Sequence, residues 1–240
     1  MIPESIKECI ILAGGLGTRL RSVVTDVPKC MAVVAGKPFL DHVIRYLLDQ
    51  GIESFIFSLG YKHEVIEDYI RAKYPDLHVQ YSIEEFPLGT GGAILLASSK
   101  LSVKNVLIIN GDTFFRVNIK KLSLFHLQNN ADCTIALKPL KNFDRYGVVE
   151  LNTKGYIISF REKKFYGEGL INGGIYILNS KLILSIPLPS KFSFEKDYLE
   201  KYYSTHKMMG LVQDEYFIDI GIPEDLLRAD KELSFHIHNS

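Results

Sequence analysis

Glycine and positive charge are concentrated in one short segment, "GGLGTRLRSVVTDVPK", which follows the apolar run "CIILA". The glycines are Gly14, Gly15 and Gly17, and Thr18, Arg19, Arg21 and Lys29 follow them. Glycine lets a backbone approach a ligand closely, and consecutive N–H groups at a turn form a cradle for an anion. The cations exceed what one phosphate group needs, so the segment predicts a polyphosphate site. The alternative is a tight strand-to-helix turn whose cations face solvent.

Two well-known phosphate motifs do not fit this segment. In a dinucleotide-binding fingerprint that includes Gly15, Leu20 occupies the place of the third glycine. In a Walker A loop that ends at Lys37, Met31 occupies the place of the first glycine and Pro38 that of the Ser or Thr. The glycines therefore belong to a different phosphate-binding pattern.

Composition places the chain among ordinary folded proteins of 240 residues, with 47% hydrophobic side chains. Lys plus Arg (28) balances Asp plus Glu (28), so no overall field favours nucleic acid or an anionic membrane. No apolar run approaches the roughly 20 residues of a membrane span, and we expect a cytoplasmic protein. Cys9, Cys30 and Cys133 form no C-x-x-C pair and are expected to be free thiols.

Alternating apolar runs and helix-period segments must position the glycine segment. We predict strands at 9–15, 54–60, 77–83 and 105–110, and helices at 38–51, 63–74 and 90–101. Repeated strand-helix-strand units favour a mainly parallel sheet with helices on both faces. In such a sheet ligands bind beyond the carboxyl ends of the strands, where Gly14 to Gly17 would lie.

The pattern changes after residue 130. Strand-like runs at 132–140, 146–152, 156–163 and 170–178 are separated by turn signals, and they predict an antiparallel extension of the sheet. A helix is expected again at 223–233. Because no Pro-, Gly- or Ser-rich linker interrupts the chain, residues 1–240 are expected to form a single domain.

The segment "LAGGLGTRLRSVVTDVPKCM" resembles the signature of the sugar-1-phosphate nucleotidyltransferases, G-G-x-G-T-R-L followed by P-K. The resemblance extends from Ile10 to about Leu233. With "PLGTGGA", "AGKPFL" and "INGGIYIL", the chain looks most like the short bacterial D-glycero-α-D-manno-heptose 1-phosphate guanylyltransferases. It departs from many relatives at Cys30 and at Val33-Val34, where prolines are common, and these changes alter no charge.

The resemblance implies a Rossmann-like three-layer α/β/α fold with a mainly parallel mixed sheet. Residues 1–130 would bind the nucleotide and residues 131–240 the sugar phosphate. The implied reaction transfers GMP from GTP to the heptose 1-phosphate, giving GDP-heptose and pyrophosphate for surface polysaccharide synthesis. The sugar phosphate is already an anion, so catalysis would rest on positioning and charge neutralisation around an in-line attack.

The resemblance also assigns roles to individual residues. The catalytic residues would be Arg19, Lys29, Asp112 and Lys163. Nucleotide binding would use Leu12, Ala13, Gly14, Gly15, Gly17, Thr18, Glu85, Pro87, Leu88, Gly89, Thr90, Gly91 and Gly111, with Glu84 as a second candidate for reading guanine. The sugar phosphate would meet Tyr146, Gly147, Glu162, Lys163, Asn172 and Gly173.

The metal expected from the resemblance is Mg²⁺, held by Asp112 and Asp219. Each aspartate follows an apolar run, and Mg²⁺ favours one or two carboxylates together with substrate phosphates. The segment "DIGIPED" resembles the family's D-I-G-T-P, with Ile222 in place of the usual Thr. This departure removes a hydroxyl near the site but no metal ligand.

Several alternatives remain open at this stage. One is a mannose-1-phosphate guanylyltransferase, or a UTP- or CTP-dependent enzyme for another hexose 1-phosphate. Another is a non-catalytic subunit that senses nucleotide sugars. A glycosyltransferase would be expected to carry D-x-D, but Thr113 and Phe114 follow Asp112. The strands around residues 130–178 are expected to offer the surface of a homodimer.

Overall fold

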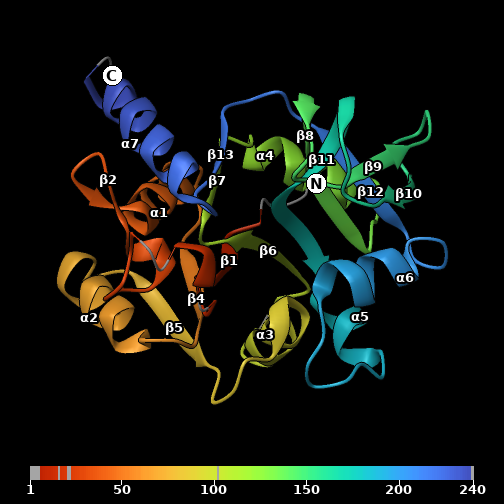
Figure 1. Ribbon diagram of the computed structural model, residues 1–240. Helices are drawn as coiled ribbons and strands as arrows, with labels where there is room; N and C mark the ends of the chain where they lie inside the picture. The colour runs from red at the N-terminus through yellow and green to blue at the C-terminus, as the bar shows by residue number, and fades with distance from the viewer. Residues whose placement is uncertain (1–5, 16, 21–22, 102, 239–240) are drawn as a thin grey trace.

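One mixed sheet runs through the centre of the molecule and takes strands from both halves of the chain (Figure 1). The computed structural model describes residues 6–15, 17–20, 23–101 and 103–238; at residue 18 and at residues 235–238 the description covers the backbone alone. Among the described residues, no helix is long and apolar enough to cross a membrane.

Neighbouring strands of the first half run parallel, in the order β5-β4-β1-β6. They are β1 (Glu8–Leu12), β4 (Ser54–Leu59), β5 (His78–Ile83) and β6 (Asn105–Asn110). Leu12, the last residue of β1, lies opposite Ser58 of β4 and Asn110 of β6. Because the strands run in one direction, their carboxyl ends open on the same edge of the sheet.

The second half of the chain reverses the direction of the sheet. Strand β11 (Tyr166–Asn179) pairs antiparallel with β6, and also with β8 (Cys133–Phe143) and β9 (Val148–Leu151). The remaining strands are β10 (Ile157–Arg161), antiparallel to β9, and β12 (Met208–Val212), parallel to β8. In Figure 1, β9 and β10 lie on the opposite side of the molecule from β5.

Helices cover both faces of the sheet because its strands are apolar on both faces. Cys9 and Ile11 of β1 point into one core and Ile10 into the other. The first core is shared with α1 (Phe39–Asp49), α2 (His63–Lys73), α4 (Ile119–Gln128) and α7 (Pro223–His238). The second core is shared with α3 (Gly89–Ser98), α5 (Ser180–Ser185) and the π-helix η3 (Phe194–Leu199), after which α6 (Glu200–Tyr202) follows.

Short helices and strands lie in the segments that connect these layers. They are the 3-10 helices η1 (Thr18–Leu20) and η2 (Lys29–Met31), the pair β2 (Val33–Val34) and β3 (Lys37–Pro38), and the pair β7 (Thr113–Phe115) and β13 (Phe217–Asp219).

The predicted elements are found, and the α/β fold class is confirmed. The prediction missed α4, α5, β12, η3 and the short strand pairs. It also made β8 and β11 too short. The two strands continue to pair beyond a register shift between Asn172 and Tyr176, where Gly174 has φ of 71°. A left-handed glycine lets a strand bend and continue, which periodicity alone does not indicate.

The packing of α4 under the sheet gives a stability prediction. His126 of α4 is buried, with Nδ1 2.9 Å from Thr134 Oγ1 and Nε2 3.2 Å from Asn105 Oδ1. Burial lowers the pKa of His126 from 6.5 to about 4. Between about pH 6.5 and pH 4, His126 is therefore protonated in the unfolded chain but neutral in the folded chain. We expect the parent to lose about 3 kcal/mol of unfolding free energy between pH 6.5 and 4 through this group.

Urea unfolding of the parent and of His126→Gln across this pH range measures that contribution. The variant should show a flatter dependence of unfolding free energy on pH. His206→Gln, at a half-buried histidine of another segment, is the control. Equal pH dependence in the parent and His126→Gln would contradict the expectation.

Candidate active site

The ends of β1 and β6 are joined directly at the edge of the sheet. The amide of Gly111 donates to the carbonyl of Leu12 over 2.9 Å, and Asp112 follows immediately. A cavity of about 170 Å³ opens beside this junction. It is lined by Leu12, Ala13, Gly15, Gly17, Arg19, Lys29, Cys30, Asp112 and Gly221. The structure thus brings together the glycine segment, two of its cations (Arg19 and Lys29) and the carboxylate of Asp112.

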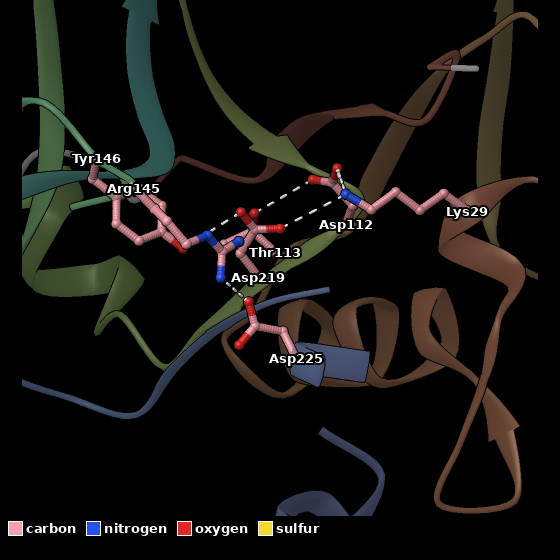
Figure 2. A network of polar contacts seen from close by, with 7 residues as sticks. All are labelled: Lys29, Asp112, Thr113, Arg145, Tyr146, Asp219 and Asp225. Carbon is pink, nitrogen blue, oxygen red and sulfur yellow. Dashed lines mark hydrogen bonds and ion pairs between the residues drawn. The ribbon is translucent and has the colours of Figure 1, made fainter. Parts of the chain in front are cut away.

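Lys29 is the cation most firmly fixed in this cavity. It begins η2, and the next residues, Cys30 and Met31, are buried and anchor the turn. The ammonium lies 2.6 Å from Asp112 Oδ2 and 3.7 Å from Asp219 Oδ1, and the side chain is only 12% exposed (Figure 2). Gly17 has φ of 58°, and a Cβ there would lie 3.1 Å from the Cβ of Lys29, so the loop and Lys29 approach closely.

Asp219 reaches the same point from a distant part of the sequence. It ends β13, directly opposite Thr113 of β7, and its side chain faces Asp112 and Lys29 in Figure 2. Burial and the nearby charge of Asp112 raise the pKa of Asp219. Its Oδ1 is buried and accepts no hydrogen bond among the described residues, and its ion-pair contact with the Lys29 ammonium is long, at 3.7 Å. A carboxylate oxygen with so few partners can accept a further cation or donor.

This arrangement fits a magnesium ion shared with a substrate. Asp112 and Asp219 offer hard oxygen ligands on one side, as Mg²⁺ requires. Within the described ranges, no group of three or more His, Cys, Asp or Glu side chains forms a metal site. Since Mg²⁺ commonly uses one or two carboxylates and completes its shell with phosphates and water, two aspartates are a sufficient protein contribution.

A second cavity, of about 430 Å³, continues from the first and holds the predicted sugar-phosphate residues. Tyr146, Gly147, Glu162, Lys163, Asn172 and Gly173 all line it. Arg19, Lys29 and Asp112 line both cavities. Glu162 and Lys163 follow β10 and are exposed at the rim, where a charged side chain can meet an incoming anion. The two cavities therefore meet at one set of charges.

The loop after β5 forms a third cavity, of about 220 Å³, beside Gly14. Glu84, Glu85 and Pro87 line it. The Glu84 carboxylate accepts a hydrogen bond from the Leu88 amide over 2.8 Å, and this contact stabilises the loop. Glu85, in contrast, is exposed at the rim of the cavity. Gly89 has φ of 73°, and a Cβ there would lie 2.6 Å from the Phe192 carbonyl oxygen, so the loop is held close to a later segment.

Some residues predicted to bind the nucleotide line none of the three cavities and contact other protein segments instead. Gly91 is buried, and its amide donates to the Phe192 carbonyl over 3.0 Å. The Thr90 hydroxyl donates to Glu195 Oε2 over 2.8 Å. Gly111 supports Leu12 without lining a cavity given above. Arg21 and the side chain of Thr18 lie outside the described part of the chain.

Arg145 and Glu195 are among the residues at the site that the sequence did not indicate. Arg145 forms an ion pair with buried Asp225 at the start of α7 and stands beside Tyr146, whose hydroxyl lies 3.5 Å from Asp219 Oδ2 (Figure 2). Glu195 lines the large cavity. The only sequence signal for Arg145 was its place before Tyr146 in "DRYGVV", and Glu195 carried none, because a charged residue on a helix is usually solvated.

Cys30 behaves as a structural thiol. It is buried, and burial together with the charge of Asp112 raises its pKa to about 12, despite the opposing effect of Lys29. A thiol with such a pKa stays protonated at neutral pH and is not a nucleophile. Cys9 and Cys133 are also buried and free, as predicted.

Comparison with known proteins bears on the whole chain. A D-glycero-alpha-D-manno-heptose 1-phosphate guanylyltransferase of Aneurinibacillus thermoaerophilus is 51% identical over 96% of this chain and 100% of that protein. The protein of the same name from Campylobacter jejuni is 45% identical over 91% of this chain and 96% of its own length. The crystal structure of HddC from Yersinia pseudotuberculosis complexed with GMP-PN matches with a TM-score of 0.86 and 41% identity.

The structural match covers 95% of this chain and 100% of the HddC chain. The pattern of the nucleotidyl transferase family matches residues 8–234, from β1 into α7. Both the glycine segment and Asp219 fall within that match. The chain therefore belongs to the nucleotidyl transferase family.

Proposed function

We propose that the chain transfers GMP from GTP to D-glycero-α-D-manno-heptose 1-phosphate, giving GDP-heptose and pyrophosphate. One observation carries this proposal: the phosphate cavity and the large polar cavity share Arg19, Lys29 and Asp112. A triphosphate in the first cavity and a sugar phosphate in the second would meet at these charges. The names of the two guanylyltransferases reported above support the choice of base and sugar.

The proposed reaction needs no protein nucleophile. A phosphate oxygen of the sugar 1-phosphate attacks the α-phosphorus of GTP, and the bond from that phosphorus to the bridging oxygen breaks to release pyrophosphate. The main cost is bringing two anions together, so positioning and charge neutralisation dominate. Arg19 and the Gly14–Gly17 backbone would hold the leaving phosphates, Lys29 the α-phosphate and Lys163 the incoming phosphate.

Asp112 and Asp219 would hold Mg²⁺, whose charge, when bound, offsets that of the phosphates. In the structure the Lys29 ammonium forms ion pairs with both carboxylates, at 2.6 Å from Asp112 and 3.7 Å from Asp219. With a triphosphate present, the same ammonium would have phosphate oxygens as further partners. Lys29 would then link the metal ligands to the reacting phosphate.

We also propose that the chain forms a single domain, because its main sheet combines strands from both halves. We further propose that it works in the cytoplasm. A homodimer formed through the strands around residues 130–178 stays a prediction. Mannose 1-phosphate remains the nearest alternative substrate, since it differs from the heptose only beyond C5. A glycosyltransferase is disfavoured because Phe114 stands where D-x-D has its second acid.

Pyrophosphate release with Mg²⁺ from the four common NTPs, each paired with heptose, mannose and glucose 1-phosphates, tests the proposal. We expect GTP with the heptose 1-phosphate to give the highest kcat/KM. Preference for UTP or CTP would contradict the choice of base, and preference for mannose that of the sugar. No turnover with any pair would favour a nucleotide-sugar-sensing protein.

Lys29→Ala and Asp112→Asn test the shared charges. Each should lower kcat/KM roughly 100- to 1,000-fold, because a well-placed charge contact in such a site contributes several kcal/mol to the transition state. Lys7→Ala, which breaks an exposed ion pair with Glu53, is the matched control and should retain the parent rate. Folded Lys29→Ala or Asp112→Asn protein with parental activity would exclude these roles.

Glu85→Gln tests the reading of guanine. A carboxylate can accept from both N1–H and the exocyclic amine of guanine, and adenine offers no such pair. We expect the ratio of kcat/KM for GTP over ATP to fall roughly 10- to 100-fold, as for loss of a charged hydrogen bond. Glu84→Ala should instead lower the melting temperature, since it removes the oxygen that accepts from the Leu88 amide. An unchanged GTP preference in Glu85→Gln would rule out that residue as the guanine acceptor.

A further inference from the structure

The hydroxyl of Thr90 belongs to the sugar side of the site, although Thr90 lies on the loop predicted to bind the nucleotide. It donates to Glu195 Oε2 over 2.8 Å and accepts from the Phe194 amide over 2.9 Å. Both partners lie in the first turn of η3. The hydroxyl proton is thereby committed to Glu195, so Thr90 does not donate to a base.

Backbone hydrogen bonds fix the same two segments to each other. The Gly91 amide donates to the Phe192 carbonyl, and the Phe192 amide donates to the Leu88 carbonyl, both over 3.0 Å. The nucleotide loop and the start of η3 are thus one connected unit. A displacement of the loop must be transmitted to Glu195.

Glu195 lines the large cavity, and one of its two carboxylate oxygens has only a long hydrogen-bond contact. Its Oε2 accepts from Thr90 and, over 3.0 Å, from Ser193 Oγ. Its Oε1 has a long contact of 3.4 Å with the Tyr176 hydroxyl, which itself accepts from Asn172 Nδ2 over 2.8 Å. A carboxylate oxygen has room for more than one donor, so Oε1 can accept another hydrogen bond.

The backbone around Glu195 is also unusual. Residues Phe194–Leu199 form a π-helix, with Ser193 capping the Lys196 amide. π-Helical turns are rare and are frequent at functional sites. The turn sets Glu195 and Lys196 on the wall of the cavity that also contains Asn172 and Lys163.

We propose that Glu195 Oε1 accepts a hydrogen bond from a hydroxyl of the sugar 1-phosphate, and that Thr90 is the positioning residue that aims this carboxylate. The inference rests on the proposed function, because it assigns a new contact within that site. It makes a residue of the nucleotide loop responsible for binding the sugar. A purely structural role for the Thr90–Glu195 pair would affect both substrates alike.

Steady-state kinetics with separate titration of each substrate distinguishes these roles. Glu195→Gln keeps the size of the side chain but weakens an acceptor, and Thr90→Val keeps the size but removes the donor. We expect each to raise KM for the sugar 1-phosphate roughly 10- to 100-fold, the effect of losing a charged hydrogen bond. The KM for the NTP should stay within about twofold of the parent value.

Thr90→Ser restores a hydroxyl and should return the sugar KM close to that of the parent. Thr205→Val, at an exposed threonine, is the matched control for removing a hydroxyl. Circular dichroism melting of every variant checks folding, and Glu195→Gln provides the test if Thr90→Val is unstable. An unchanged sugar KM in Glu195→Gln, or an equal rise of both KM values, would overturn the inference.

The assay uses the substrate pair that gives the parent its highest kcat/KM. If the parent turns over no pair, the proposed function fails, and the contact inferred for Glu195 fails with it. If the parent turns over a pair and the variants leave the sugar KM unchanged, only the inference about Thr90 and Glu195 fails.

Discussion

An ammonium group held between two carboxylates organises this molecule. Lys29, Asp112 and Asp219 come from three distant parts of the chain, and their charges would repel or remain unpaired without one another. Partial burial strengthens the interaction, because Lys29 and Asp219 are only 12% and 22% exposed, although Asp112 is 36% exposed. The order of the sheet, the turn at η2 and the β7–β13 pair all serve to bring these side chains to one point.

The site lies where the sheet changes direction. Strands β1 and β6 are parallel and deliver the glycine segment and Asp112 at one edge, whereas β11 runs antiparallel beside β6 and carries Asn172 and Gly173. Ligands of open α/β sheets commonly bind at such a reversal. The two halves of the chain therefore contribute different cavities to one opening, and the shared cations lie at their junction.

The same geometry accounts for chemistry without a nucleophile. Cys30 is buried in the phosphate cavity wall with a raised pKa, so it stays neutral. The groups that remain are cations, carboxylates and backbone amides, which bind and orient phosphates. The hydrogen bonds between residues 88–91 and residues 192–195 connect the loop after β5 with the wall of the large cavity.

The sequence by itself determined the α/β class and most strands and helices of the first half, because these depend on local periodicity. It also placed glycines and cations next to one another in the Gly14–Lys29 segment. Through resemblance it also indicated Asp112 and Asp219. Only the tertiary structure decided the pairing of Lys29 with both aspartates and the turning of Thr90 toward Glu195. These depend on contacts between residues 83 to 190 positions apart, which local sequence does not encode.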